Sequence, residues 1–189
     1  MRHRDDAKEE AIVEAAIRLI NKNGFASTSI SKIAKEAGVS PATIYVYFES
    51  KEDLLNNLYL MTKESMIESI GFHYDQTAGW EVNFKHFFDS TCRFMMNNRD
   101  SLAFLEQCWS NPMISAATLE QGAKMFTPVF ELFQKGVAAG AFKPLDTQVT
   151  MALVFLPMMN YIRGMQNESA ECLTGLEQLR DCTWDAIKK

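Results

Sequence analysis

Residues 28–55 constrain the fold of this chain more than any other segment, because they describe two short helices separated by a single glycine. Apolar residues take the i, i+3, i+4, i+7 spacing of one helical face at Ile30, Ile33, Ala34 and Ala37. Gly38 predicts the end of this helix, since glycine adopts a positive φ at little cost. Ser40 and Pro41 then predict a second helix, with serine as N-cap and proline at the first helical position. This layout is typical of a helix-turn-helix, whose second helix enters the major groove of DNA.

Flanking residues predict how the helices of this segment begin. Thr28 or Ser29 can cap the first helix, because a short hydroxyl side chain accepts a hydrogen bond from an otherwise unpaired backbone N–H. Ser50 with Asp53 resembles a capping box for a third helix, with aspartate in place of glutamate or glutamine. The segment therefore carries local start and stop signals for three consecutive helices.

The outer face of the second helix carries the residues expected to meet DNA. Ile44 and Phe48 form its inner face, four residues apart. The residues left to point outward are Ala42, Thr43, Tyr45 and Tyr47. Tyrosine hydroxyls position proteins on phosphates, and small residues let the helix approach base edges, where the methyl and hydroxyl of Thr43 can take part in readout. An alternative for Tyr45 is that its ring packs at the edge of the core. Lys51 is also expected to contact a phosphate, and the alternative is that its ammonium is simply solvated.

Over residues 8–55 the chain resembles the N-terminal domain of the TetR family of bacterial transcription regulators. The residues that carry the resemblance are Ile12, Ala15, Ala16, Leu19, Ile20, Asn23–Phe25, Thr28–Ile30, Ile33, Ala34, Ala37–Ser40, Thr43–Tyr45, Tyr47, Phe48 and Ser50–Leu54. The positions that this resemblance assigns to DNA contact are Thr28, Ser31, Ser40, Pro41, Ala42, Thr43, Tyr45, Tyr47 and Lys51. It implies an all-α chain, with a DNA-binding domain over residues 1–50 and an effector-binding and dimerisation domain over residues 51–189.

Beyond residue 50 the apolar spacing predicts helices only, with no alternation typical of strands and no internal repeat. The expected helices cover residues 51–70, 80–97, 100–110, 115–139, 147–165 and 172–187. A loop is expected over 71–79, and a connector that contains glycine and proline over 140–146. Pro157 is expected to kink the helix that contains it, because proline lacks the N–H for one helical hydrogen bond.

Large apolar side chains at helical spacing suggest a second function for residues 51–189. Such a stripe is more often packed core than ligand pocket, but the family resemblance favours an effector cavity between the long helices. The effector-pocket candidates are Phe84, Phe87, Phe88, Phe104, Gln107, Cys108, Trp109, Phe126, Phe130, Phe155 and Met159. Apolar walls with a few polar groups are typical of small-molecule sites, so the expected effector is apolar or amphipathic.

The helix expected over residues 147–165 is apolar almost all round, which indicates burial on both sides. One side can face the core of the same chain and the other a second copy, together with the last helix. The dimer-interface candidates are Met151, Val154, Met158, Tyr161, Leu176, Leu179, Thr183 and Ile187. A homodimer would place two recognition helices one DNA turn apart on a palindromic double-stranded operator. The alternative is that this stripe only seals the core of the monomer.

The charge distribution is compatible with DNA binding. The net charge is −5, but the first 63 residues hold nine Lys/Arg and nine Asp/Glu, so the negative excess lies in the remainder. Phosphate binding depends on local charge on one face rather than on the total. Arg2, Arg4 and Lys8 form a candidate basic arm, with a frayed tail as the alternative. A neutral N-terminal domain predicts modest non-specific affinity for DNA.

Other function classes lack support. The chain has no run of about twenty apolar residues and no apolar segment like a signal peptide near its start, so we expect a cytoplasmic protein without a membrane partner. Four cysteines lack Cys-x-x-Cys spacing, three histidines are scattered, and no nucleophile or phosphate-loop motif occurs. No metal, cofactor or enzymatic activity is therefore expected. The sequence predicts a repressor released by an effector, and the alternative is a ligand-independent regulator or activator with the same fold.

Overall fold

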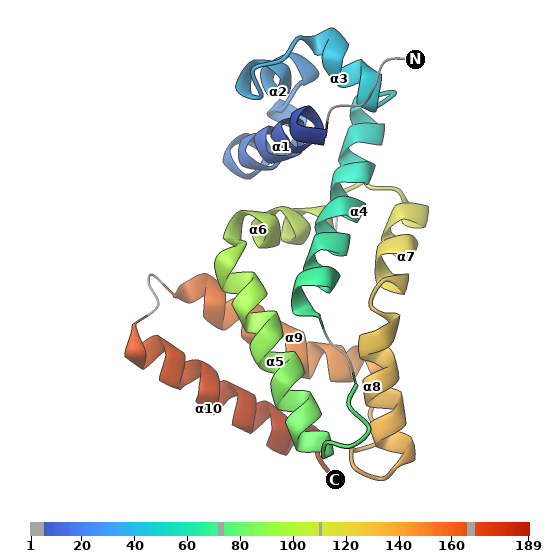
Figure 1. Ribbon diagram of the computed structural model, residues 1–189, viewed down its shortest axis with the longest axis vertical. Helices are drawn as coiled ribbons and strands as arrows, with labels where there is room; N and C mark the ends of the chain where they lie inside the picture. Colours follow the sequence, from blue (N-terminus) through green and yellow to red (C-terminus); the bar gives the residue numbers. More distant parts are fainter. Residues whose placement is uncertain (1–5, 72–73, 110, 166–168) are drawn as a thin grey trace. The chain divides into compact units, whose positions relative to one another are not determined.

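The computed structural model describes residues 6–71, 74–109, 111–165 and 169–189, and within these residues the protein is all-α (Figure 1). Its helices are α1 (Asp6–Ser27), α2 (Ile30–Glu36), α3 (Pro41–Tyr47), α4 (Lys51–Ile70), α5 (Trp80–Asn97), α6 (Arg99–Cys108), α7 (Ala116–Lys124), α8 (Thr127–Ala138), α9 (Thr147–Gly164) and α10 (Ala170–Ile187). The predicted all-α class is confirmed. Arg2 and Arg4 of the candidate arm lie outside the described residues.

One predicted helix is wrong. The segment expected as a single helix over residues 115–139 forms α7 and α8 instead. Pro128 is the second residue of α8, where it needs no N–H, but a helix continuing from α7 would require that donor. The hydroxyl of Thr127 donates to the backbone oxygen of Lys124 at 2.6 Å. Proline therefore divides an otherwise continuous apolar stripe.

The helices group into two compact units. The first unit consists of residues 1–64 and 100–123, and the second of residues 65–99 and 124–189. The first unit therefore contains the helix-turn-helix segment together with nearly all of α6 and α7. The second contains the end of α4, all of α5 and α8 to α10. The functional boundary expected at residues 50 and 51 stays a prediction.

In the first unit, α1 supplies the apolar face that covers the helix-turn-helix segment. The residues of that face with no exposed surface are Ile12, Ala15, Ala16 and Ile20, whereas Leu19 is half-buried. Gly24 interrupts α1 with φ 76°, in the left-handed region that glycine adopts at little cost. The ring of Phe25 stacks on that of Phe104 in α6, with centroids 5.9 Å apart. The end of α1 is thereby packed against α6.

Hydrogen bonds reinforce this contact between α1 and α6. The side-chain amide of Asn21 donates to the backbone oxygen of Asp100 at 2.8 Å. The Nε2 atom of Gln107 donates to the Oδ1 atom of Asn21 at 2.9 Å. These bonds join residues nearly eighty or more positions apart in the sequence, so α6 is fixed to the last turns of α1.

The core of the second unit is a chain of aromatic rings. Phe87 of α5 meets Phe133 of α8 and Phe155 of α9 edge-on, at centroid distances of 6.1 and 5.7 Å. Phe142, in the connector before α9, packs on Phe133 at 5.8 Å and on Trp184 of α10 at the same distance. Offset and edge-on ring pairs add about 0.5–1.5 kcal/mol each beyond the area that they bury. The chain of rings thus joins α5, α8, α9 and α10.

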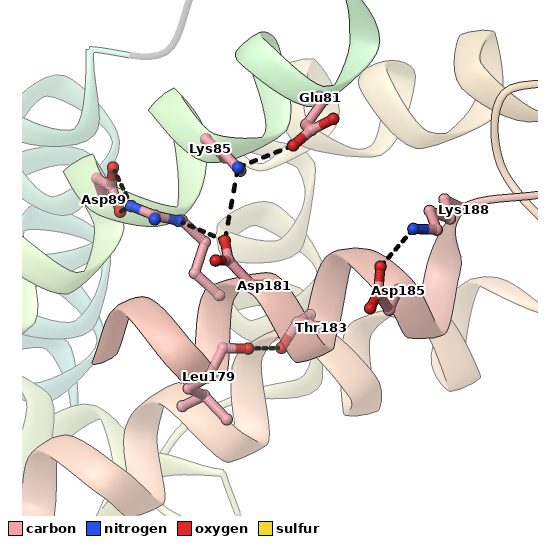
Figure 2. A network of polar contacts seen from close by, with 9 residues as sticks. Glu81, Lys85, Asp89, Leu179, Asp181, Thr183, Asp185 and Lys188 are labelled. Carbon is pink, nitrogen blue, oxygen red and sulfur yellow. Dashed lines mark hydrogen bonds and ion pairs between the residues drawn. The ribbon is translucent and has the colours of Figure 1, made fainter. Parts of the chain in front are cut away.

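Ion pairs hold α10 against α5, as Figure 2 shows. The guanidinium of Arg180 donates to both carboxylate oxygens of Asp89 at 3.2 and 3.1 Å, and its Nε donates to Asp181 at 3.2 Å. The ammonium of Lys85 lies 2.8 Å from Glu81 and 3.5 Å from Asp181. All three carboxylates are exposed, so the network contributes little stability and mainly fixes the position of α10 along α5.

Candidate nucleic-acid interface and ligand-binding regions

The turn between α2 and α3 is closed by backbone hydrogen bonds around Gly38. Gly38 has φ 68°, in the left-handed region predicted from the sequence. The N–H of Val39 donates to the oxygen of Ala34 at 2.9 Å, and the N–H of Gly38 donates to the oxygen of Lys35 at 3.3 Å. This pair of bonds is a Schellman motif, which fixes the direction in which the chain leaves α2. Ser29, one of the two predicted caps, accepts a hydrogen bond from the N–H of Lys32 at 3.3 Å.

The start of α3 is fixed by Ser40. Its hydroxyl oxygen accepts from the N–H of Thr43 at 3.1 Å, and Pro41 occupies the first helical position, as predicted. The hydroxyls of Ser40 and Thr43 also lie 2.9 Å apart and share a hydrogen bond. The Thr43 hydroxyl is therefore engaged within the protein. This hydrogen bond favours one rotamer of the Thr43 side chain.

The exposed face of α3 differs from the predicted one at Tyr47. Tyr45 is 55% exposed, as expected, but Tyr47 is only 8% exposed, so the prediction that it points outward is wrong. The buried residues Ile44, Tyr47 and Phe48 follow the i, i+3, i+4 spacing of one helical face. This spacing was present in the sequence and places Tyr47 inside. Its ring packs beside that of Phe48, with centroids 6.3 Å apart.

Two further DNA-contact candidates bond to the end of α1. Thr28 is 1% exposed, and its hydroxyl donates to the oxygen of Gly24 at 2.9 Å. A side chain so buried has no surface to offer DNA, which corrects its predicted role as a contact. Lys51 is half-buried, and its ammonium donates to the backbone oxygen of Phe25 at 2.8 Å. The bond of Thr28 is local to the break in α1, whereas the bond of Lys51 joins this break to the start of α4.

The remaining contact candidates lie at the surface, together with residues that the sequence analysis passed over. Ser31, Ser40, Pro41 and Ala42 are exposed, and Thr43 is half-buried. Val46 is 39% exposed beside Tyr45, and the spacing from Ala42 through Tyr45 to Val46 would have indicated this face. Lys32 and Lys35 are further exposed cations, and both belong to α2. The ammonium of Lys32 donates to the oxygen of Ser27 at 2.8 Å.

The start of α4 shows the predicted cap in a modified form. The hydroxyl of Ser50 accepts from the N–H of Asp53 at 3.0 Å. The carboxylate of Asp53 accepts from the N–H of Glu49 at 2.8 Å, one residue earlier than in a standard capping box. Aspartate, which is shorter than the usual glutamate, thus bonds here to the N–H of Glu49 rather than to that of the N-cap residue Ser50. Lys51 follows this cap as the first residue of α4.

The effector-pocket candidates are divided between the two units. Phe104, Gln107 and Cys108, with Trp109 directly after α6, belong to the first unit, and the other candidates to the second. The candidates in the second unit are Phe84, Phe87, Phe88, Phe126, Phe130, Phe155 and Met159. Phe84, Phe87 and Phe88 are at most 1% exposed and pack against other rings. The aromatic stripe of α5 is therefore packed core in this structure.

A lysine, a tyrosine and a cysteine come together in the first unit. The ammonium of Lys63 lies 5.8 Å from the centre of the Tyr59 ring, within the range of a cation–π contact. Burial lowers the pKa of Lys63 to about 8, and burial raises the pKa of the Cys108 thiol to about 12. Burial also raises the pKa of Tyr59. Cys108 is therefore a protonated, unreactive thiol at neutral pH.

A pocket of about 270 Å³ lies in the second unit, lined by residues of α8 and of the segment that starts α9. Its walls include the rings of Phe130 and Phe133 with Val137, and its polar groups include Gln134 and Thr147. Of the effector-pocket candidates, only Phe130 is among its lining residues. None of its lining residues carries a charge. Such walls suit an uncharged ligand.

The dimer-interface candidates are mostly buried in the chain's own core. Val154 and Met158 have no exposed surface, and Leu176, Thr183 and Ile187 are at most 7% exposed. They pack within the second unit and have little or no surface to offer a partner. Met151, Tyr161 and Leu179 are half-buried. The large apolar residues that are exposed on α9 and α10 are instead Val149, Leu153, Leu156 and Leu173.

In the described part of the chain, no group of three His, Cys, Asp or Glu residues is placed to hold a metal ion. No helix among those residues is both long enough and apolar enough to cross a membrane.

Two family descriptions match this chain. Residues 12–58 match "Bacterial regulatory proteins, tetR family", and residues 60–189 match "Tetracyclin repressor-like, C-terminal domain". The first match covers α2 and α3 with their supporting helices, and the second covers the greater part of the chain.

Individual relatives agree with these matches. The fatty acid metabolism regulator protein of Bacillus subtilis is 49% identical over 55 residues, which are 29% of this chain and 27% of that protein. The uncharacterized HTH-type transcriptional regulator YfiR of the same organism is 25% identical over 159 residues, 81% of this chain and 77% of that protein. The crystal structure of a TetR family transcription regulator from Marinobacter aquaeolei VT8 has a TM-score of 0.86 at 24% identity and covers both chains completely.

Proposed function

The chain belongs to the TetR family of bacterial regulatory proteins, and from that premise we propose that it is a repressor that binds a palindromic operator as a homodimer and is released by a small effector. DNA-binding regulation follows from the family and its helix-turn-helix relatives. The observation that carries the proposal is the exposed face of α3, where Tyr45 and Val46 stand beside the small residue Ala42.

The proposed contacts with DNA have two kinds. Tyr45 and the exposed hydroxyls of Ser31 and Ser40 bind phosphates, since hydroxyl groups fix the register of a protein on the duplex. Ala42 and Thr43, at the start of α3, approach the base edges of the major groove. Tyr47 and Thr28 act by packing the helix-turn-helix segment. This assignment relies on the exposure of each side chain rather than on its chemistry alone.

Dimerisation is proposed through the exposed apolar face of α9 and α10. Val149, Leu153 and Leu156 repeat at intervals of four and three residues, which places them on one side of α9, and Leu173 is exposed on α10. Contiguous exposed apolar residues mark interaction sites. Two copies joined there would carry two recognition helices, and the operator would have half-sites about 34 Å apart, one turn of DNA.

Release by an effector requires that its affinity differ between the free and the DNA-bound protein. A coupling free energy of about 1–3 kcal/mol would be ordinary. α4 extends from its cap at Ser50 into the second unit without interruption, so a change at one end can reach the other through one helix. Equal affinity of the effector for free and operator-bound protein would remove this part of the proposal.

Tyr45→Ala tests the DNA contact. The side chain is exposed, so the variant should keep its helicity and its oligomeric state. Its affinity for a selected operator fragment should fall about tenfold, the equivalent of 1.4 kcal/mol. Val82→Ala, which shortens another exposed apolar side chain on α5, is the matched control and should bind as the wild type does. Unchanged binding by Tyr45→Ala, measured by fluorescence anisotropy, would refute the contact.

Leu153→Glu tests the dimer interface. A charge buried in an apolar contact without a partner is costly, so this variant should sediment as a monomer at micromolar concentration. Val82→Glu places the same charge on another exposed apolar position, on α5, and should leave the association state unchanged. If both variants remain dimeric in analytical ultracentrifugation, the interface lies elsewhere.

A ligand-independent regulator is the second candidate function. The observation in its favour is the dense ring packing around Phe84, Phe87 and Phe88, which are at most 1% exposed. Rings packed in this way fill the space between α5 and its neighbours with side chains of the protein itself. A regulator of this kind would show the same operator affinity across a screen of small molecules, whereas the favoured function predicts at least one ligand that weakens binding.

A further inference from the structure

The 270 Å³ pocket of the second unit is bounded by α8 on one side and by the start of α9 on the other. Its volume is near the lower limit of small-molecule pockets, which span about 300–1,000 Å³. Phe130, Phe133 and Val137 give it an apolar wall, and Leu145 and Met151 give it another. The pocket is therefore large enough for a small organic molecule and offers such a molecule apolar contact on two sides.

The polar groups of the pocket are few and neutral. Gln134 is exposed at its edge and can both donate and accept. The hydroxyl of Thr147 is a second neutral group. The hydroxyl of Thr150 donates to the oxygen of Asp146 at 3.1 Å, which leaves its lone pairs able to accept. These groups can orient a ligand that carries one hydrogen-bonding end.

The surroundings of the pocket disfavour an anionic ligand. The N-terminus of a helix attracts anions, but the N-terminus of α9 is already capped by the carboxylate of Asp146, which accepts from the N–H of Gln148 at 2.7 Å. On α8, Glu131 and Lys135 neutralise each other at 3.1 Å. Burying a charged ligand among the remaining apolar groups would cost free energy without compensation.

The pocket also touches elements that matter for assembly. Phe133 contacts Phe87 of α5 and Phe142, and Phe142 contacts Trp184 of α10. Gly136 lets Phe142 approach α8 closely, since a Cβ atom there would lie 2.2 Å from its ring. Thr147 and Met151 begin the helix whose exposed residues are proposed to pair two copies. A molecule in the pocket thus meets both the ring chain and the start of α9.

We propose that this pocket is the effector site of the protein and that it binds an uncharged, largely apolar small molecule with one hydrogen-bonding end. Calling the ligand an effector rests on the proposed function, whereas the prediction that the pocket binds such a molecule does not. The site differs from the predicted one, because the rings of α5 form packed core, while the pocket lies between α8 and the start of α9 and is partly open to solvent.

Two dyes that differ by one charged group test the proposal. N-phenyl-1-naphthylamine is uncharged, and 1-anilinonaphthalene-8-sulfonate carries the same rings with an added sulfonate. Both fluoresce more strongly in apolar surroundings. The wild-type protein should bind the uncharged dye with saturation and at least tenfold more tightly than the anionic dye. Absence of saturable binding of the uncharged dye, or equal affinity for the two, would overturn the proposal.

Neighbouring alanines provide a matched pair of variants. Ala138 lines the pocket, whereas Ala139 is not among the lining residues, and both are exposed near the end of α8. Ala138→Phe should weaken binding of the uncharged dye at least tenfold, and Ala139→Phe should leave it unchanged. Equal binding by both variants would place the dye elsewhere, for instance on the exposed face of α9, and would overturn the proposal.

The dye titrations contain no DNA, so failure of the effector-site proposal can be told apart from failure of the proposed function. A protein that binds its operator but shows no pocket-dependent dye binding would refute only the effector site. A protein that binds the dye as expected but enriches no DNA would refute the proposed function and leave the pocket standing.

Discussion

Replacing Lys51 with methionine separates a structural role of this side chain from a role at DNA. The ammonium donates to the backbone oxygen of Phe25 at 2.8 Å and is half-buried. A hydrogen bond to a charged group contributes about 1.5–3 kcal/mol. Lys51 is also the first residue of α4, where removing a positive charge relieves about 0.3–1 kcal/mol of unfavourable interaction with the helix dipole. Lys51→Met should therefore lower the free energy of unfolding by about 1–2 kcal/mol.

The same variant has a second readout at DNA. An ammonium has three donors, and the bond to Phe25 uses one, so Lys51 can still meet a phosphate. Loss of one phosphate contact should lower the slope of log affinity against log salt by about 0.9. Urea denaturation measures the first effect and anisotropy titrations at several salt concentrations the second. Lys22→Met, the same change at an exposed position of α1, should alter stability by less than about 0.5 kcal/mol. A Lys51→Met variant as stable as the wild type would refute the reasoning about the bond to Phe25.

Four other substitutions, one of them a control, test the interior and its charges. Gly136→Ala should lower the free energy of unfolding by about 1 kcal/mol, because the new Cβ would lie 2.2 Å from the ring of Phe142 and the strain exceeds the gain in helix propensity. Gly164→Ala, with no atom within 4 Å of the new Cβ, should be neutral or stabilising in the same denaturation assay. Lys63 has a pKa lowered by burial to about 8, so its destabilising effect is complete below pH 8 and fades as the pH rises toward 10.5, the unfolded value. Between pH 7 and 9.5 the wild type should gain about 2 kcal/mol relative to Lys63→Met, and a constant difference would contradict the buried, shifted amine. Arg180→Met should cost less than about 1 kcal/mol and lose its effect in high salt, whereas a salt-independent loss would show that the ion pairs are not responsible.

Local signals in the sequence predicted the parts of the fold that local interactions determine. The bounds of α4 and α5 agree with the expected helices at both ends. Gly38 adopts the left-handed conformation that its position requires, and Ser40 caps α3 as expected. These features depend on hydrogen bonds between residues a few positions apart, which are legible in a single sequence.

Features that depend on tertiary packing were predicted less well. α9 is apolar almost all round, so spacing could not tell which residues face the core, and Val154 and Met158 turned out to be buried within the unit. Whether an aromatic stripe encloses a cavity depends on how rings from several helices fit together, as Phe142 fits over Gly136. Tyr47 is different, because its i, i+3, i+4 spacing with Ile44 and Phe48 indicates burial from the sequence alone.

The most direct test of the central claim, operator recognition by the exposed face of α3, is selection of genomic DNA fragments by the purified protein, followed by sequencing. Tyr45→Ala, which removes an exposed side chain from that face, serves as the control. The proposed function predicts that the wild type enriches a palindromic site with half-sites one helical turn apart and that the variant does not. Equal enrichment by both proteins, or none by a folded wild-type protein, would contradict it.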